Sequence, residues 1–154
     1  MKNHSLPQQQ FETVWFSGPS HPLSNLYLWD IFVFGRWYNS AEQAYQYKKA
    51  MFHKHTLLAW HILTTGCTRK IMKIAKCYKE SPEWKRVRCI YMIEILQVKM
   101  ENCGPYAAAL WNIPGDHPDI RERTKHPHWG GICGSNALGD IHRIMHWKVT
   151  RSMF

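Results

Sequence analysis

The sequence lacks long apolar runs, paired cysteines and a secretory signal. None of its apolar stretches approaches the roughly 18 residues that a membrane-spanning helix needs, so we expect no membrane partner. The N-terminus is polar and lacks the hydrophobic segment of a signal peptide. The five cysteines are odd in number and include no Cys-x-x-Cys pair. This disfavours a disulfide framework or a structural zinc site and favours reduced thiols in a cytoplasmic protein.

The common signatures of nucleotide, metal and nucleophilic sites are also absent. There is no P-loop, dinucleotide fingerprint, His-Glu-x-x-His helix or nucleophile elbow. His126 and His128 are two residues apart, and His142 and His146 are one helical turn apart. Zinc would need a third ligand, so surface or packing histidines are the preferred interpretation. We therefore expect no metal and no cofactor.

Positive charge and aromatic side chains are what the sequence has in excess. Twenty Lys and Arg against eleven Asp and Glu give a formal net charge of +9. Such an excess attracts phosphate groups, whether on nucleotides or on nucleic acid, although a solvated basic surface without a ligand is also consistent with it. With eight Trp, seven Tyr and six Phe, some aromatic rings are expected to line a surface or a pocket.

The patterns predict an α+β protein dominated by helices, with a small antiparallel sheet near its start. Residues 1–10 are expected to form a flexible leader, and 11–154 a single domain. β-Rich segments predict strands at 13–16, 31–34 and 37–38, and a lone strand at Ile120. Apolar periodicity and helix-start signals predict helices at 40–53, 57–63, 69–78, 82–101, 106–111 and 138–148.

The longest of these helices begins at a clear signal. Ser81 is suited to the N-cap, and Pro82 to the first helical position. The apolar positions then predict a face that packs on the core, formed by Val87, Ile90, Tyr91, Ile95 and Val98.

The predicted helix at 40–53 carries the main candidate for chemistry. Ser40 and Gln43 have capping-box spacing, which places Glu42 in the first helical turn. There the helix dipole stabilises a carboxylate and is expected to lower its pKa. Helical spacing puts Tyr45, Gln46 and Lys49 on the same face. An ionised glutamate there can activate water, but this stretch alone favours a residue that only complements the dipole.

A glycine-rich loop precedes the last predicted helix, and basic residues cluster elsewhere. Residues 128–136 read His-Trp-Gly-Gly-Ile-Cys-Gly-Ser-Asn. Glycines let the backbone approach a ligand, and amides before a helix suit a phosphate, although such a connection is usually only a turn. The basic clusters at 69–79 and 85–88 support a phosphate-binding stripe and a solvated face about equally.

Several short motifs occur in the order of one known family and at close to its spacings. They are Leu23-Ser24-Asn25-Leu26-Tyr27; Gly35 with Tyr38, Ser40, Glu42, Tyr45-Gln46 and Lys49-Ala50; Trp84 with Val87, Met92, Leu96 and Lys99; and Trp129-Gly130 with Gly134, Asn136, Leu138 and Gly139. On this ordered set, the sequence from about Phe16 to Met145 resembles the YbiA/NADAR family.

The resemblance implies a mostly helical fold and an N-glycosidase that splits the bond between ribose C1 and nitrogen. Members of the family act on phosphorylated ribosylamino-pyrimidine intermediates of riboflavin synthesis, or remove ADP-ribose from guanine in DNA. ADP-ribose or another ribose-phosphate conjugate, and single-stranded DNA, are thus the expected partners. Glu42 would stabilise the positive charge that develops on the sugar and accept a proton from the attacking water.

The resemblance also suggests residues that hold the sugar and base. Trp129 is expected to stack on one of them. Tyr45, on the Glu42 helix, is a further candidate for substrate binding. Asn25 is expected to bind a ribose hydroxyl or the base edge. Trp84 is expected to form a wall of the pocket, with simple core packing as the alternative.

A second group is expected to contact phosphate. Gly130, Gly134 and Asn136, in the glycine-rich loop, are expected to shape the phosphate side of the site. Lys49 is expected either to meet a phosphate or to tune the Glu42 carboxylate.

The sequence departs from the family pattern just before the tryptophan. The family usually carries a Leu-Val-Glu-like stretch and then an acidic residue three positions before the tryptophan. Here the stretch reads Asp119-Ile120-Arg121-Glu122, and His126 takes the acidic place. Because a histidine can act as acid or base near neutral pH, His126 is the second candidate catalytic residue. A different substrate, or weakened activity, is the other consequence of this departure.

Three functions are therefore consistent with the sequence. The first is an N-glycosidase or ADP-ribosyl glycohydrolase with Glu42 as its acid/base group. The second is a non-catalytic module that binds ADP-ribose or a related nucleotide. The third is a basic nucleic-acid-binding domain. Substrate, oligomeric state and pathway are left open.

Overall fold

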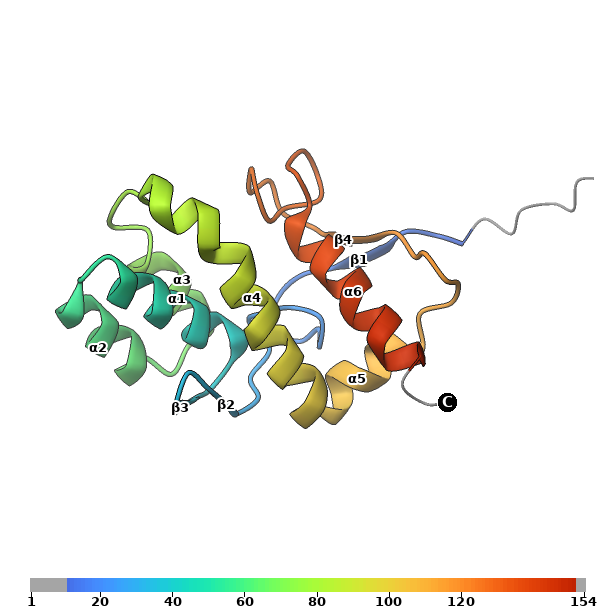
Figure 1. Cartoon of the computed structure of the whole chain (residues 1–154), viewed down its shortest axis with the longest axis horizontal. Coiled ribbons are helices and arrows are strands. Elements are labelled where there is room, and N and C mark those ends of the chain that lie inside the picture. The colour runs from blue at the N-terminus through green and yellow to red at the C-terminus, as the bar shows by residue number, and fades with distance from the viewer. Residues whose placement is uncertain (1–10, 152–154) are drawn as a thin grey trace, which may run out of the picture.

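A computed structural model describes residues 11–151, so the leader expected at 1–10 lies outside the described residues. Four short strands and six helices follow one another in this part of the chain (Figure 1). The helix predicted at 69–78 is shorter and ends at Ile74. The elements are β1 (Val14–Phe16), β2 (Ile31–Val33), β3 (Arg36–Tyr38), α1 (Ala41–Phe52), α2 (Thr56–Thr64), α3 (Thr68–Ile74), α4 (Pro82–Asn102), α5 (Gly104–Trp111), β4 (Ile120–Glu122) and α6 (Ala137–Arg151).

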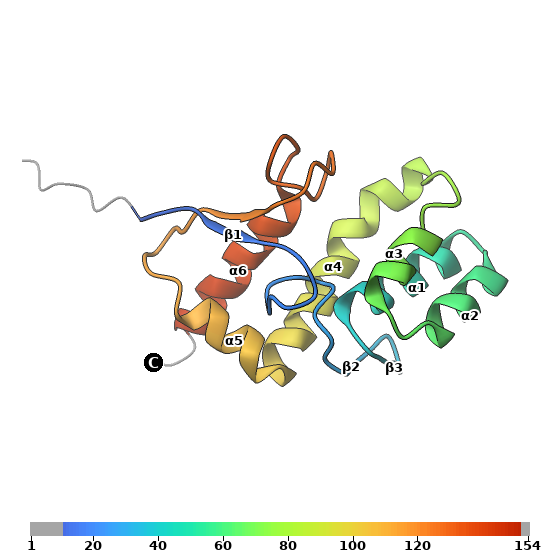
Figure 2. The same cartoon turned by 180° about the vertical axis from the view of Figure 1, so that it is seen from behind.

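Helix α4 runs through the middle of the molecule and divides it into two parts. Helices α1, α2 and α3 lie on one side of it, and α5, α6, β1 and β4 on the other (Figures 1 and 2). Helix α4 itself contacts α1, α5 and α6.

The strands form two separate two-stranded sheets. β2 and β3 make the antiparallel hairpin expected near the start of the chain, with Ile31 opposite Tyr38. Phe34 and Gly35 have φ values of 54° and 74°, as a two-residue hairpin turn requires. β1 does not join this hairpin but pairs in parallel with β4. The parallel partner lies far along the chain, where local patterns give no indication of pairing.

The start of α1 confirms the capping prediction and explains how α1 is held. The Ser40 hydroxyl accepts the backbone N–H of Gln43 at 3.1 Å. The Gln43 side-chain oxygen accepts the N–H of Asn39 at 2.8 Å, one residue earlier than in the standard box. The Gln43 amide nitrogen also donates to the carbonyl of Ile62 at 3.1 Å. One glutamine thus closes the first turn of α1 and ties it to the end of α2.

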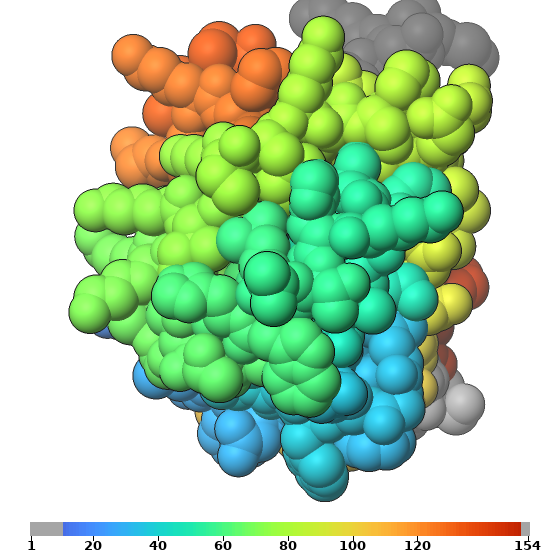
Figure 3. Space-filling model, turned by 90° about the vertical axis from the view of Figure 1, so that its left-hand side faces the viewer, coloured from blue at the N-terminus to red at the C-terminus, as the bar shows by residue number. Residues whose placement is uncertain are grey.

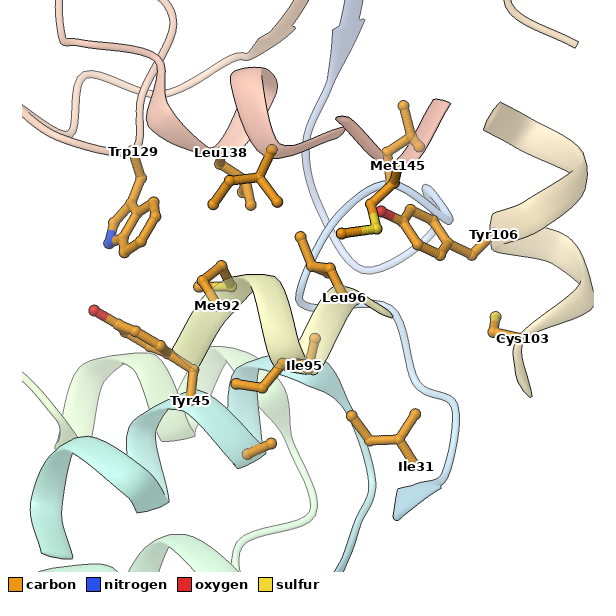
Figure 4. Packing of buried hydrophobic residues seen from close by; sticks show 14 of the residues in the cluster. Ile31, Tyr45, Met92, Ile95, Leu96, Cys103, Tyr106, Trp129, Leu138 and Met145 are labelled. Carbon is orange, nitrogen blue, oxygen red and sulfur yellow. The ribbon is translucent and has the colours of Figure 1, made fainter. Parts of the chain in front are cut away.

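The core lies along a face of α4 that overlaps the predicted one, since Ile95 is fully buried and Val87, Tyr91 and Val98 are partly buried against the core. Ile90 is 58% exposed, so its assignment to the core was wrong. The fully buried positions Met92, Ile95, Leu96 and Lys99 repeat at helical spacing. The predicted face included Ile95 but left out Met92, Leu96 and Lys99, the last because a charged side chain is rarely buried. Figure 4 shows Ile95 and Leu96 of α4 within the apolar cluster.

Ser40→Ala is expected to lower the free energy of unfolding by about 1 kcal/mol, because the N–H of Gln43 loses its acceptor in a buried helix start. Urea unfolding followed by far-UV circular dichroism measures the change. Ser20→Ala, at an exposed loop position, is the matched control and should change stability by less than about 0.5 kcal/mol. Equal stabilities of the two variants would show that the cap does not hold α1.

Candidate active site

Two cavities that share a wall lie between α1, α3 and the segment from β4 to α6. We call them the Asn25 chamber, of about 410 Å³, and the Lys49 chamber, of about 400 Å³, and together the cleft. Hollows of about 510 Å³ beside Trp29 and about 530 Å³ beside Trp147 are larger, but neither is lined by a buried carboxylate. The shared wall consists of Glu42, Tyr45, Met72, Glu122, Thr124 and Trp129.

Glu42 lies on the shared wall, in the first turn of α1, and only 8% of its surface is exposed. Its Oε1 accepts the side-chain N–H of Gln46 at 2.8 Å. Burial nevertheless raises the pKa of Glu42, although Gln46, Lys49 and Lys76 act in the opposite direction. The lowered pKa expected from the helix dipole is therefore wrong, because removal from water outweighs a helix terminus.

Glu122 is a second carboxylate on the same wall, and the sequence interpretation gave it no role. It ends β4, and its Oε2 accepts the Thr124 hydroxyl at 3.1 Å. Burial, and then the negative charge of Glu42, raise the pKa of Glu122 to about 7, against the Thr124 hydrogen bond. One signal in the sequence could have indicated it. Residues 119–122 differ from the Leu-Val-Glu-like stretch of the family but keep its final glutamate.

The two carboxylates form an electrostatically coupled pair. Ionisation of both on one wall of the cleft is unfavourable, so the pair retains a proton up to about pH 7. Glu42 has the stronger stabilisation of its charge, from an amide donor and nearby lysines. We therefore assign the carboxylate to Glu42 and the proton to Glu122. A proton donor and an acceptor thus line the same cleft.

Aromatic and apolar side chains face the carboxylates. The rings of Tyr45 and Trp129 meet edge to face, with centroids 5.6 Å apart. Figure 4 shows them around the same space as Met92 and Leu138, which also line the Asn25 chamber. The Tyr45 hydroxyl is buried with no protein hydrogen-bond partner. This wall combines flat apolar surface with an unsatisfied polar group, as a base or sugar site requires.

Asn25 lines the chamber named after it and is nearly fully buried. Its amide nitrogen contacts the sulfur of Met92 at 3.4 Å, and its amide oxygen has no protein partner. Because a buried amide oxygen normally finds a donor, this side chain is suited to bind a ligand. The Asn25 main-chain carbonyl accepts the N–H of Glu42 at 3.0 Å.

A chain of three charges supports the Lys49 chamber. Lys49 is buried, and its Nζ lies 3.4 Å from Oε1 of Glu80. The other oxygen of Glu80 accepts from Arg88 at 2.9 Å. The Arg88 guanidinium lies 5.9 Å from the centre of the Trp129 ring. Lys49 is thus partly neutralised and linked to the stacking wall, an arrangement that the sequence did not indicate for Glu80 and Arg88.

Exposed cations surround the cleft. Arg69 and Lys73 line the Asn25 chamber, and Lys76 and Lys125 line the Lys49 chamber. Figure 3 shows this end of the molecule, with the α3 region in green and the segment between β4 and α6 in orange above it. Part of the basic cluster at 69–79 therefore lies at the mouth of the cleft, where anions would be attracted.

His126 lines the Lys49 chamber, but its Nδ1 is occupied by the loop. That atom accepts the backbone N–H groups of His128 at 3.1 Å and Trp129 at 3.0 Å. Burial lowers the pKa of His126, and the nearby positive charge of Arg88 also lowers it, although Glu80 acts in the opposite direction. His126 is therefore neutral near pH 7 and holds the loop that carries Trp129. The catalytic role of His126 stays a prediction, and it would have to use the other ring nitrogen, Nε2.

The glycine-rich loop lines the cleft through Trp129, whereas its glycines and Asn136 support the site from behind. Neither Gly130, Gly134 nor Asn136 belongs to the residues that line the two chambers. A Cβ on Gly130 would lie 2.7 Å from the N of His126, so the loop packs closely there. The Asn136 amide donates to the carbonyl of Ile120 at 2.9 Å, and its oxygen accepts the N–H of Glu122 at 3.4 Å. These contacts position Glu122, and the structure places none of the three residues at a phosphate site.

Trp84 also lies away from the cleft. It is fully buried, and its ring contacts Tyr45 and Tyr91 with centroids 5.6 Å and 5.5 Å away. It lines neither chamber. The expectation of a pocket wall is replaced by its alternative, core packing behind Tyr45. Of the predicted residues, the structure brings Asn25, Glu42, Tyr45, Lys49, His126 and Trp129 together.

Two further features are defined by the described residues. No helix within 11–151 is long and apolar enough to cross a membrane. Over the same residues, no group of three or more His, Cys, Asp and Glu side chains is arranged to hold a metal ion.

Comparison with known proteins identifies the fold. No family model matches the sequence, and no curated protein matches it either. The structure, however, is similar to the NMR structure of the E. coli protein YbiA, with a TM-score of 0.66 and 18% sequence identity. The similarity covers 92% of this chain and 84% of that one. The protein is thus of the α+β class with two small sheets, and its fold is YbiA-like.

Glu122→Gln is expected to stabilise the protein above pH 7. Because the pKa of Glu122 is raised from 4.5 to about 7, the folded protein retains a proton that the unfolded chain has lost. The free energy of unfolding therefore falls as the pH rises from 4.5 to about 7, and it stays lower above pH 7. The variant should recover about 1–3 kcal/mol at pH 8 and little at pH 4.

Urea unfolding at both pH values measures this effect. Glu83→Gln is the matched control, since Glu83 is exposed on α4. A change in stability that is the same at pH 4 and pH 8 would contradict a buried, coupled Glu122.

Proposed function

We propose that the protein is an N-glycosidase that hydrolyses the C1–N bond of a phosphorylated ribose conjugate. The observation that carries the proposal is the pair of carboxylates on the wall shared by the two chambers, the buried Glu42 and the partly buried Glu122. Glycoside hydrolysis requires one carboxyl group that holds a proton and another that does not. The structural similarity to YbiA supports the fold that the proposal requires, and the sequence motifs support the proposed reaction.

The assignment of the proton gives each glutamate a role. Protonated Glu122 would donate to the nitrogen of the leaving base as the C1–N bond breaks. The ionised Glu42 would stabilise the positive charge that develops at the sugar and accept a proton from the water that forms the new C1–O bond. Gln46, which donates to Glu42, fixes the orientation of the carboxylate.

The chambers on either side of the carboxylates fit a substrate of two parts. Tyr45 and Trp129 offer ring surface at the junction, and Asn25 offers a free amide oxygen. Lys49 and the exposed cations at the mouth would bind phosphate groups. Cations line both chambers, which favours a conjugate with several phosphates. On this ground we propose ADP-ribose on guanine in single-stranded DNA ahead of the ribosylamino-pyrimidine phosphates.

Glu42→Gln is expected to lower turnover by about 10²-fold or more, because the amide cannot accept a proton or balance the charge on the sugar. Ligand affinity should change little, since Gln keeps the size of the side chain. The assay incubates the protein separately with ADP-ribosylated guanine in single-stranded DNA and with the ribosylamino-pyrimidine phosphates. Glu83→Gln serves as the control on an exposed carboxylate.

The products distinguish the candidate functions. Free ADP-ribose released from DNA supports the proposal, and ribose 5-phosphate places the protein with glycosidases of small metabolites. If neither substrate is cut but ADP-ribose binds, the protein is a binding module and the proposal is wrong. If Glu42→Gln is as active as wild type, the proposed mechanism is wrong.

Turnover is also expected to fall as the pH rises through about 7. Glu122 has a pKa of about 7, and above that value it has no proton to give to the leaving base. The profile of kcat against pH measures this alkaline limb. In Glu122→Gln the limb should be absent, and the residual activity should be low. A wild-type profile that stays flat from pH 6 to 9 would rule out Glu122 as the acid.

A further inference from the structure

Lys99 is a buried cation that the proposed reaction does not use. It lies on α4 and is 1% exposed. Its Nζ donates to the carbonyl of Pro22 at 2.7 Å and to that of Ser24 at 3.0 Å. The rings of Tyr106 and Tyr27 lie around it, with centroids 4.7 Å and 5.8 Å away. An ammonium group in the core is unfavourable unless such partners replace water.

The two carbonyls belong to the loop that leads to Asn25. This loop is made of turns, in which the N–H of Ser24 donates to His21 at 2.9 Å and that of Tyr27 to Ser24 at 3.2 Å. A buried carbonyl group needs a hydrogen-bond donor. The Lys99 amine donates to the carbonyl of Pro22 and adds a second donor to that of Ser24, which already accepts the N–H of Tyr27. The loop is therefore fastened to α4 through this side chain.

The same loop is joined to the start of α1 one residue further on. The carbonyl of Asn25 accepts the N–H of Glu42 at 3.0 Å. Glu42 has its N–H in the first helical turn, where no carbonyl of the helix can accept it. The chain of contacts thus runs from Lys99 through Ser24 and Asn25 to the backbone of Glu42. At its end lie two side chains that line the Asn25 chamber.

We propose that Lys99 is a positioning residue, which holds the Asn25 loop so that the Asn25 side chain and the Glu42 carboxylate keep their places in the cleft. The expected effect of Lys99 on catalysis rests on the proposed function. Its expected effect on the position of the loop does not.

The donors of Lys99 matter more than its charge. Burial lowers the pKa of Lys99 to about 7, so the amine loses its proton easily. An ammonium group has three N–H donors and a neutral amine has two. Two donors suffice for the two carbonyls of Pro22 and Ser24. The anchor therefore holds in either protonation state.

The test replaces Lys99 by Met, which has a similar length and no N–H donor. Two amides at the start of α1 are compared by hydrogen exchange on the full chain. The N–H of Glu42 is bonded to the loop, and the N–H of Ala44 is bonded to Ser40 at 3.2 Å. Lys99→Met should make Glu42 exchange at least about tenfold faster relative to Ala44. An unchanged ratio would overturn the proposal.

Tyr106→Phe is the matched control from the same buried cluster. It removes the hydroxyl that lies 2.8 Å from Nδ1 of His142 but keeps the ring beside Lys99. It leaves the two hydrogen bonds of Lys99 to Pro22 and Ser24 in place, so the exchange ratio should not change. A ratio that rises equally in both variants would show that Lys99 acts only through general stability.

Kinetics and spectroscopy complete the test. If wild type cleaves the C1–N bond, Lys99→Met should lower kcat about tenfold with little change for Tyr106→Phe. If wild type does not cleave it, the proposed function fails and the exchange ratio still decides the role of Lys99. Should Lys99→Met not fold, NMR of the unmodified protein must show correlations from Nζ to the carbonyl carbons of Pro22 and Ser24. A freely exchanging amine without them would contradict the anchor.

Discussion

The burial of two carboxyl groups in one cleft is the constraint on which the rest of the structure depends. Glu42 and Glu122 come from opposite sides of α4, and each is removed from most of its water. Desolvation and mutual repulsion are both unfavourable, so the pair persists only because the surrounding fold holds it. Gln46 and Thr124 donate to the two groups, and one retained proton removes most of the repulsion.

The elements around the cleft position this pair from several directions. The first turn of α1 fixes Glu42, and the amide of Asn136 fixes the strand end that carries Glu122. The Arg88 guanidinium beside Trp129 links the stacking wall to α4. Because α4 contacts helices on both sides, it fixes the position of one side of the cleft relative to the other. A rigid frame of this kind is what catalysis by oriented charges requires.

Much of the fold and part of the site were accessible from sequence, and the errors have a common origin. Helix starts such as Ser40 depend on neighbouring residues, and local pattern found them. The pKa of Glu42, the setting of Trp84 and the partner of β1 depend on residues distant in sequence, and local pattern misjudged each. A matched motif showed that Trp84 mattered to the fold but not which space it filled.

By itself, the sequence determined where the helices begin, which face of α1 carries Glu42, and that the order of motifs resembles one family. Only the tertiary structure decided that Glu122 lies with Glu42 on the shared wall, that the glycines of the last loop and Asn136 do not line the cleft, and that Lys99 is buried. The reason is physical. Hydrogen-bonded turns and helix caps are local, whereas desolvation and electrostatic coupling arise only when distant segments exclude water together.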